Sequence, residues 1–155
     1  MLKTDGAAIN VFGGKLTTSR RLAEAVLDKI ELILGKKSPA WTKIAKLPGG
    51  EFEPLAFDAE VRRLGMDYGW LPPKLAYRLC RLYGTRARMV LGDAKDLAGL
   101  GPQFGADLFG REVDYLVDHE WARTAQDVLW RRTKLGLRVG PEDVARLEAY
   151  LAERG

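Results

Sequence analysis

The chain has 155 residues, and its 25 lysines and arginines against 21 aspartates and glutamates give a net charge of +4. A chain of this length can bury a core without disulfides or metals, so one domain of ordinary size is expected. No apolar stretch approaches the roughly 18 residues that a membrane-spanning helix needs, and nothing near Met1 resembles a signal peptide. The modest basic surplus favours an ordinary solvated surface over a patch for phosphates or anionic lipid.

The first segment predicts a short strand that runs into a helix. Residues 8–12 are mostly apolar and compatible with an extended backbone, and Gly13 and Gly14 interrupt them. The hydroxyl residues 17–19 offer caps for a helix, which carries an apolar stripe at helical spacing and ends at Gly35.

The next stretch, residues 36–56, carries three prolines and two adjacent glycines with no sustained hydrophobic period. Such a composition indicates a connection between two parts of a protein. We therefore divide the chain into a strand–turn–helix at residues 1–35, a linker at 36–56 and a helical domain at 57–155.

The helical domain begins with two segments delimited by residues that start or stop helices. Asp58 is expected to cap the first, which ends at Gly65. The Pro72–Pro73 pair suits the first turn of the second, which ends before Gly84.

Further short helices follow. Thr85 is expected to cap one that ends at Gly92, and the glycine-rich stretch 93–110 holds only a turn or two. Helix resumes around Arg111. Thr124 with Asp127 is a variant of the capping box and opens the next helix, and Gly140–Pro141 opens the last.

These elements predict an all-α fold: a small domain of several short helices, preceded by one strand and one helix. A lone strand leaves backbone N–H and C=O groups unpaired, which is costly. We therefore expect the sequence to be a piece of a longer polypeptide whose remaining sheet lies beside the strand.

The glycine turn is the segment best suited to chemistry. Two glycines let the backbone approach a ligand closely, and the helix that follows presents unpaired N–H groups at its positive end. Lys15 adds a full charge there, and Arg20 and Arg21 occupy a first turn whose dipole disfavours cations, which suggests an anionic neighbour. The alternative from residue types alone is a simple glycine turn with a solvated lysine.

Ordered blocks of residues resemble those of one known family. Val11-Phe12-Gly13-Gly14-Lys15-Leu16-Thr17-Thr18 and then Arg21-Leu22-Ala23-Glu24 look like the segment that closes the flavin domain in aerobic, membrane-associated, FAD-dependent glycerol-3-phosphate dehydrogenases. The family's C-terminal helical domain is resembled by Tyr115 to Trp121 and by Leu129 to Lys134. Pro39 to Thr42 and Leu47 to Gly50 also match. The likeness extends from about Ile9 to the end, so the chain is identified as the C-terminal part of such an enzyme.

The resemblance implies a flavoenzyme that binds FAD noncovalently, oxidises sn-glycerol 3-phosphate to dihydroxyacetone phosphate and passes electrons to quinone. It places five residues at the cofactor: Gly13, Gly14, Lys15, Leu16 and Thr17. Lys15 would also face the substrate. Negative charge on the reduced ring would be stabilised there by N–H groups and a cation. Ser19 stands where the family commonly has tyrosine, which puts a packing contact in doubt.

Other parts of the family's site are absent from this sequence. The dinucleotide-binding glycine fingerprint is missing, and the Gly99, Gly101 and Gly105 cluster has no preceding strand. The chain alone is therefore expected to be inactive and not to retain FAD. By the resemblance its partners are the rest of the flavoenzyme, quinone and the membrane surface. The parent would be cytoplasmic and peripheral on the inner face of the cell membrane, with a homodimer as one option and no nucleic acid or metal.

No catalytic residue is assigned within the helical domain. His119 lies between two acidic neighbours that cannot all face one point on a helix, so a structural role is favoured. Cys80 has no disulfide partner and is expected in the core, which fits a reducing compartment. Trp121 and Trp130 are expected in core or half-buried packing. The basic stretch 131–134 suits a solvated helix end, although phosphate or lipid headgroups are the alternative.

A second hypothesis is a small nucleic-acid-binding module. Residues 79–87 and 97–106 faintly resemble helix–hairpin–helix elements, in which a glycine turn lets backbone N–H groups contact phosphates. Four basic residues lend it support: Arg78, Arg81, Arg86 and Arg88.

Overall fold

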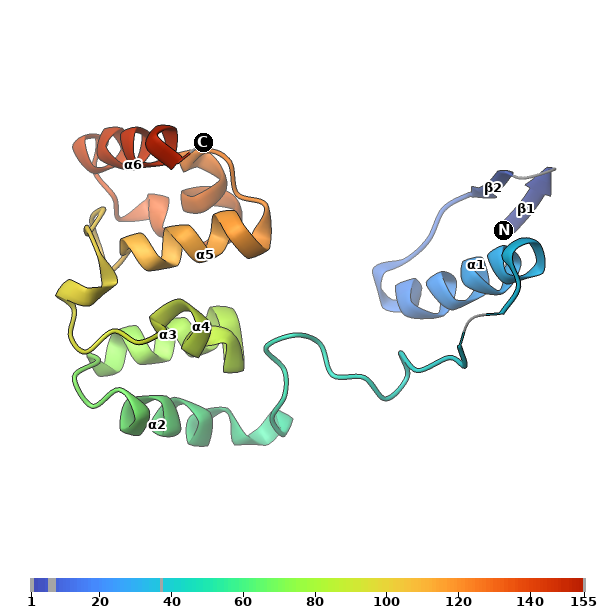
Figure 1. Cartoon of the computed structure of the whole chain (residues 1–155), viewed down its shortest axis with the longest axis horizontal. Helices are drawn as coiled ribbons and strands as arrows, with labels where there is room; N and C mark the ends of the chain where they lie inside the picture. The colour runs from blue at the N-terminus through green and yellow to red at the C-terminus, as the bar shows by residue number, and fades with distance from the viewer. Residues whose placement is uncertain (1, 6–7, 37, 155) are drawn as a thin grey trace. The chain divides into compact units, whose positions relative to one another are not determined.

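The computed structural model describes residues 2–5, 8–36 and 38–154 (Figure 1). It divides into two compact units, Met1–Lys46 and Leu47–Gly155, which we describe separately. Residue 37, inside the stretch expected to be a linker, lies outside the described residues.

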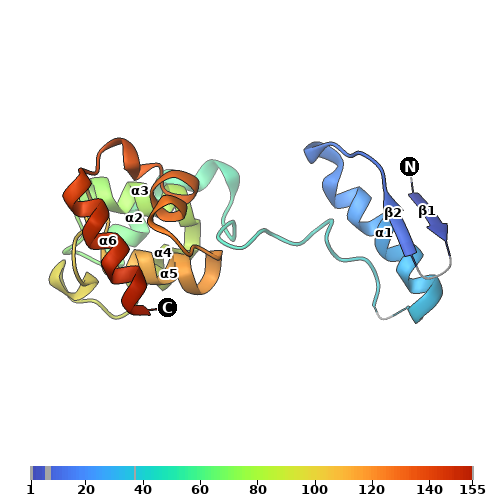
Figure 2. The same ribbon diagram turned by 90° about the horizontal axis from the view of Figure 1, so that it is seen from above.

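The first unit holds a two-stranded antiparallel sheet and one long helix (Figure 2). Strand β1, Leu2–Asp5, pairs with β2, Ala8–Val11, so that Leu2 lies opposite Val11. A 3-10 turn at Leu16–Thr18 then leads into α1, Ser19–Leu34.

The expectation that the strand at residues 8–12 stands alone was therefore wrong. Residues 2–5, Leu-Lys-Thr-Asp, show no apolar alternation, so their sequence did not indicate a strand. They form one because a neighbouring extended segment offers backbone partners in an antiparallel register.

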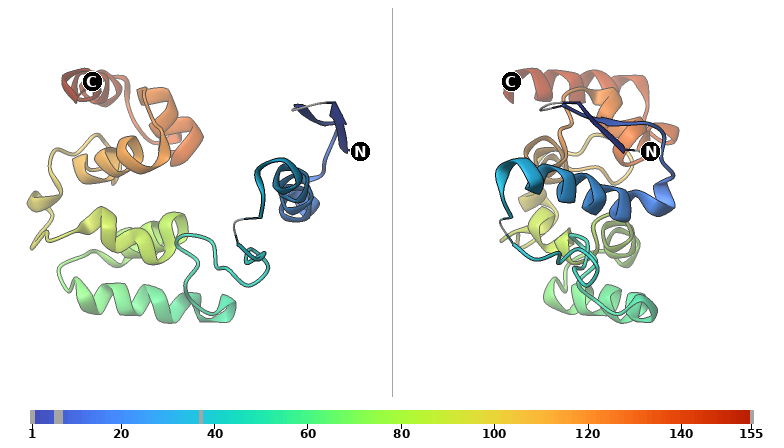
Figure 3. Two further views of the ribbon diagram at one scale, coloured as in Figure 1. Left: turned by 45° about the vertical axis from the view of Figure 1, so that its right-hand side comes forward. Right: turned by 90° about the vertical axis from the view of Figure 1, so that its right-hand side faces the viewer.

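The second unit is helical, which confirms the predicted fold class. Figure 1 and the left view of Figure 3 show its helices in successive layers, from α2 through α3 and α4 to α5 and then α6. The α-helices are α2 Phe57–Asp67, α3 Pro73–Tyr83, α4 Ala87–Leu91, α5 Gly110–Glu120 and α6 Pro141–Arg154. A 3-10 turn at Pro54–Ala56 leads into α2, and further 3-10 turns lie between the later helices at Gly84–Arg86, Ala98–Leu100 and Leu135–Leu137.

Two predicted helix starts differ from the structure. Asp58 does not cap α2, because it lies inside the helix as its second residue. The helix also continues past Gly65 to Asp67. Thr85 caps no helix either, because its hydroxyl donates to the Glu51 carboxylate instead. This hydrogen bond lowers the pKa of Glu51.

The capping box at Thr124 is confirmed. The Thr124 N–H donates to the Asp127 carboxylate at 3.0 Å, and the Asp127 N–H donates back to the Thr124 hydroxyl at 3.1 Å. The helix that follows is a π-helix over Asp127–Arg132, which the sequence pattern did not predict.

One apolar core holds the helical unit together. Its fully buried side chains come from every α-helix of the unit, and they include Leu64, Leu79, Leu91, Val113, Leu116 and Leu147. Cys80 is part of this core at 3% exposure, as expected from its apolar neighbours. Burial raises the pKa of its thiol, and the nearby Glu60 carboxylate adds to this effect.

A charged cluster is enclosed within the same core. The Arg78 guanidinium donates to both Glu112 carboxylate oxygens at 2.6 Å and to Asp107 at 3.0 Å, and the Tyr83 hydroxyl donates to Glu112 at 2.7 Å. Glu112 is only 2% exposed. Burial and the Glu112 charge both raise the pKa of Tyr83, so its hydroxyl stays a donor.

The loop that enters the helical unit is fixed by contact between two glycines. The Thr85 N–H donates to the Gly49 carbonyl at 3.0 Å, and both Gly49 and Gly84 have positive φ, at 88° and 56°. A Cβ atom on Gly84 would lie 1.9 Å from the Gly49 oxygen. Only glycine fits this crossing, which holds the Leu47–Gly50 loop against the end of α3.

Replacing Gly84 with alanine is therefore expected to cost about 2–3 kcal/mol, from a strained backbone and from displacement of the loop. Gly65→Ala is the matched control, since Gly65 lies in α2 with nothing within 4 Å of its Cβ position. That change should stabilise the chain by about 0.5–1 kcal/mol through helix propensity. Urea unfolding of the two variants measures both effects, and equal midpoints would contradict the account of this crossing.

Candidate functional site

The predicted flavin-side segment forms an open loop in the first unit. Gly13 and Gly14 have φ values of 76° and 146°, and a Cβ on Gly13 would meet nothing within 4 Å. Lys15 follows with extended backbone, and all residues from 11 to 20 are exposed. The structure thus brings Gly13, Gly14, Lys15, Leu16 and Thr17 together in one exposed turn before α1.

The hydroxyls beside this turn do not cap it, contrary to expectation. The Thr18 hydroxyl donates to the Lys15 carbonyl at 3.1 Å, and the Ser19 hydroxyl donates to the Leu16 carbonyl at 2.7 Å. They therefore satisfy carbonyl oxygens and accept nothing from the first N–H groups. The Thr18 N–H already donates to the Lys15 carbonyl and the Ser19 N–H to the Leu16 carbonyl, so the N–H groups of Leu16 and Thr17 are those available to an outside acceptor.

Arg20, a cation in the first turn of α1 where the helix dipole disfavours it, pairs with a carboxylate of its own helix. Its guanidinium donates to Glu24 at 2.5 Å, and the Thr42 hydroxyl donates to the same carboxylate at 2.5 Å. The Thr42 hydrogen bond and Arg20 lower the pKa of Glu24. Arg20 therefore needs no external anion, and Lys15 is the better candidate to meet one.

The first unit has no buried side chain among the described residues 8–36 and 38–46. Large apolar side chains stand exposed along it: Phe12 at 62%, Leu16 at 90%, Leu32 at 80%, Leu34 at 67% and Trp41 at 63%. A helix with so little packing is only marginally stable in water.

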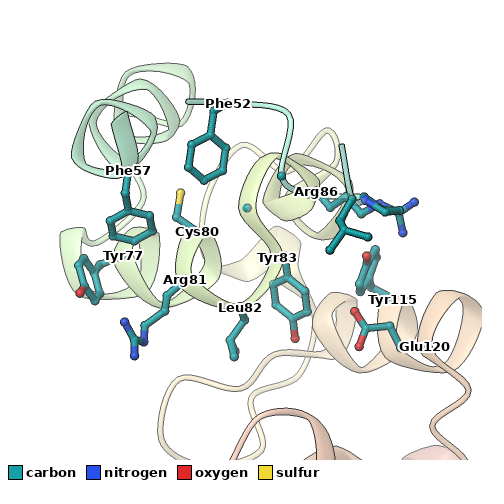
Figure 4. Close-up of a pocket in the computed structure, with 15 residues that line it drawn as sticks. Phe52, Phe57, Tyr77, Cys80, Arg81, Leu82, Tyr83, Arg86, Tyr115 and Glu120 are labelled. Carbon is teal, nitrogen blue, oxygen red and sulfur yellow. The ribbon is translucent and has the colours of Figure 1, made fainter. Parts of the chain in front are cut away.

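The helical unit carries an open groove of about 800 Å³ (Figure 4). One wall is the Leu47–Gly50 loop, and α3 and α5 provide the others. Cys80 lies between the rings of Phe52 and Phe57 in this view. Charged side chains of the lining are Arg81, Arg86 and Glu120.

This groove offers no paired acid and base for catalysis. The Cys80 thiol is buried with a raised pKa, and the Tyr83 hydroxyl is committed to Glu112. Neither group is a ready nucleophile. The sequence pattern did not reveal the groove, because its walls come from segments far apart in the chain.

The conspicuous single residues are placed as follows. His119 is exposed, and its ring lies 4.9 Å from that of Tyr115 between centroids. Trp130 is 46% exposed and lies against Gly136, where a Cβ would be 2.4 Å from the indole. Trp121 is 80% exposed, so the expectation of core or half-buried packing was wrong for it.

Basic residues at the C-terminal end of the π-helix make contacts within this segment. Arg131 pairs with Asp127 at 2.6 Å, and the Lys134 ammonium donates to the Trp130 carbonyl. Cations at this end also suit the helix dipole. The simpler interpretation, a solvated helix end, thus fits the contacts.

Two of the four arginines behind the nucleic-acid hypothesis are occupied by carboxylates. The Arg78 guanidinium donates to the carboxylates of Glu112 and Asp107, and the Arg88 guanidinium donates to Asp67 at 2.6 Å. The Gly84 turn packs against the Gly49 backbone and so does not present itself to a phosphate chain. The geometry therefore does not favour a helix–hairpin–helix surface.

Asp127 should make the free energy of unfolding of the helical unit depend on pH in the acidic range. The Arg123 N–H and the Thr124 hydroxyl lower its pKa to about 2, from an ordinary value of 3.8. A depressed carboxylate pKa contributes stability that is present above pH 4 and is lost as pH falls toward 2. We expect Asp127→Ala to cost about 1 kcal/mol at pH 7 and only a small part of that at pH 2, where the wild-type carboxylate is half protonated. Urea unfolding across this range measures the gap, and a pH-independent gap would contradict the assignment.

Within the described parts of the chain, no helix combines the length and apolar character needed to cross a bilayer. The same residues contain no cluster of histidine, cysteine, aspartate or glutamate side chains that could hold a metal ion.

Comparison with known proteins gives a consistent picture. A family model for the C-terminal domain of alpha-glycerophosphate oxidase matches residues 40–152. The chain is 47% identical over 143 residues to a glycerol-3-phosphate dehydrogenase of Pseudomonas aeruginosa, covering 92% of this chain and 28% of that protein. It is 43% identical over 145 residues to the aerobic glycerol-3-phosphate dehydrogenase of Escherichia coli, covering 94% and 29%.

A relative with a different named substrate is almost as similar. The D-erythritol 1-phosphate dehydrogenase of Brucella abortus is 44% identical over 133 residues, covering 85% of this chain and 26% of that protein. The chain thus spans less than a third of the length of these relatives. The matches over more than nine tenths of the chain extend well into residues 1–39, which the family model does not cover.

Proposed function

This chain belongs to the family of the C-terminal domain of alpha-glycerophosphate oxidase, and we propose that it is the C-terminal part of an FAD-dependent sn-glycerol-3-phosphate dehydrogenase. The observation that carries the proposal is the similarity of almost the whole chain to less than a third of such dehydrogenases, together with the match of residues 40–152 to a C-terminal domain. The parent would oxidise glycerol 3-phosphate to dihydroxyacetone phosphate and pass electrons to quinone. It would be a peripheral protein on the inner face of the cell membrane.

The open glycine loop fits a role at the flavin. Gly13 leaves room for a flat ring, and the first N–H groups of the turn lack side-chain acceptors. FAD, when bound, supplies the acceptor for the electrons of the alcohol. Lys15 and the N–H groups of Leu16 and Thr17 would stabilise the negative charge that this transfer places near the loop.

The exposed apolar surface of the first unit also supports the proposal. No described side chain of residues 8–36 and 38–46 is buried, although α1 carries several large apolar residues. Burying such surface gives roughly 25 cal/mol per Å², so a covering partner would stabilise the unit. We assign that cover to the flavin-binding part of the same polypeptide. The chain by itself would then be structural and inactive.

The substrate is tested by a panel of polyol phosphates. Glycerol 3-phosphate is proposed, and the similarity to a D-erythritol 1-phosphate dehydrogenase makes that longer phosphate the second candidate. Initial rates of dye reduction by the full-length protein, measured with both compounds, separate the two. A higher kcat/KM with glycerol 3-phosphate supports the proposal, and activity with neither compound would refute it.

A further inference from the structure

Trp121 combines a strained backbone with an exposed side chain. It follows α5 with φ 58° and ψ 24°, in the left-handed region, while the Ala122 N–H donates to the Leu116 carbonyl at 3.0 Å. This is the helix-end position at which glycine is strongly preferred, because a side chain there is sterically disfavoured. A tryptophan at this position opposes the stability of its own turn.

The cost of this conformation is not offset by packing within the helical unit. Trp121 is 80% exposed. The two other described non-glycine residues with positive φ differ from it: Ala106 is small, and the Lys134 ammonium donates to the Trp130 carbonyl. A large aromatic ring held in water by a strained backbone indicates a contact outside the unit.

The surface on either side of Trp121 is hollowed. Glu120, the residue before it, lines the groove of about 800 Å³. Arg123, two residues after it, lines a second hollow of about 470 Å³ together with Leu151 of α6. A partner seated on Trp121 would therefore find receptive surface on both sides.

We propose that Trp121 anchors this helical unit to the flavin-binding part of the same polypeptide. The inference rests on the proposed function, because it needs a longer parent. The occupant follows from length, since relatives that match nearly all of this chain are more than three times as long. A tethered partner is present at high effective concentration, so one aromatic anchor is enough to hold the two parts together.

Limited trypsin digestion of the full-length protein tests the anchor. Trypsin cuts after Lys43 and Lys46, both exposed in the segment that precedes the helical unit. Trp121→Gly and Trp121→Asn remove the ring and relieve the strain, and they should speed this cleavage at least about fivefold. Neither change should lower the thermal midpoint of the helical unit, because glycine and asparagine suit the left-handed position.

Two control variants isolate the ring. Leu137→Asn removes another exposed apolar side chain, which is 78% exposed, and Ala106→Gly relieves a positive φ without removing a ring. Both should be cleaved at the wild-type rate. Wild-type cleavage in both Trp121 variants would overturn the proposal. A loss of oligomeric mass with unchanged cleavage would also overturn it, since the ring would then contact a second copy.

The proposed function is tested separately on the same preparation. FAD content and reduction by glycerol 3-phosphate in the wild-type protein report on the flavin assignment. A wild-type protein that lacks FAD would refute the proposed function, while faster cleavage in the Trp121 variants would still report docking.

Discussion

Lys15→Ala in the full-length protein is expected to slow flavin reduction by glycerol 3-phosphate about 10²-fold, the effect of removing one preorganised charge-stabilising group. Lys15 stands in the exposed turn before α1, beside N–H groups that no side chain caps. The neighbouring Arg20 is already paired with Glu24. Lys15 is therefore the cation of this turn best placed to meet charge on a flavin or substrate.

Anaerobic stopped-flow absorbance measures this effect as the rate of flavin bleaching. Lys29→Ala is the control, because Lys29 is an exposed lysine of α1, the helix after the turn, and lies away from the turn. It should reduce flavin at the wild-type rate. Unchanged bleaching and FAD content in Lys15→Ala would remove the assignment of this residue.

Arg78→Ala is expected to lower the free energy of unfolding by about 3–5 kcal/mol, because it leaves a buried carboxylate without its cation. Glu112 is 2% exposed and receives two hydrogen bonds of 2.6 Å from Arg78. Such a loss is a large share of the roughly 5–15 kcal/mol that stabilises a domain. Arg78→Lys should recover little, since an ammonium cannot reproduce the paired donors.

Two further variants sharpen this test by chemical denaturation. Arg138→Ala removes an exposed arginine that lies 3.5 Å from Asp107, the second carboxylate with which Arg78 pairs. This change should lower the free energy of unfolding by less than about 1 kcal/mol. Arg78→Met combined with Glu112→Leu removes both charges and should be clearly more stable than Arg78→Ala alone. If the double variant were the less stable of the two, the cost would not come from an unpaired buried charge.

Residues that start or stop helices allowed much of the helical unit to be predicted from the sequence. The Pro72–Pro73 pair and Gly84 delimit α3, and Gly140–Pro141 marks the start of α6, because these residues act through backbone geometry alone. The Thr124–Asp127 capping box is equally local. Features that depend on distant partners were not predicted. Arg78 and Glu112 are 34 positions apart, and β1 exists only through its pairing with β2.

The candidate site shows the same division. The glycine turn and its exposed lysine were predicted, since two glycines between a strand and a helix indicate an open backbone. The roles of the hydroxyls were not, because Thr18 and Ser19 can either accept from N–H groups or donate to carbonyls. The exposure of Trp121 was also missed, since an aromatic residue in an apolar neighbourhood usually indicates packing.

The absorption spectrum of the purified full-length protein tests the central claim most directly. We expect a yellow protein with an oxidised flavin spectrum that bleaches when glycerol 3-phosphate is added without oxygen. A colourless protein, or a flavin spectrum that no polyol phosphate bleaches, would contradict the assignment of this chain to an FAD-dependent dehydrogenase.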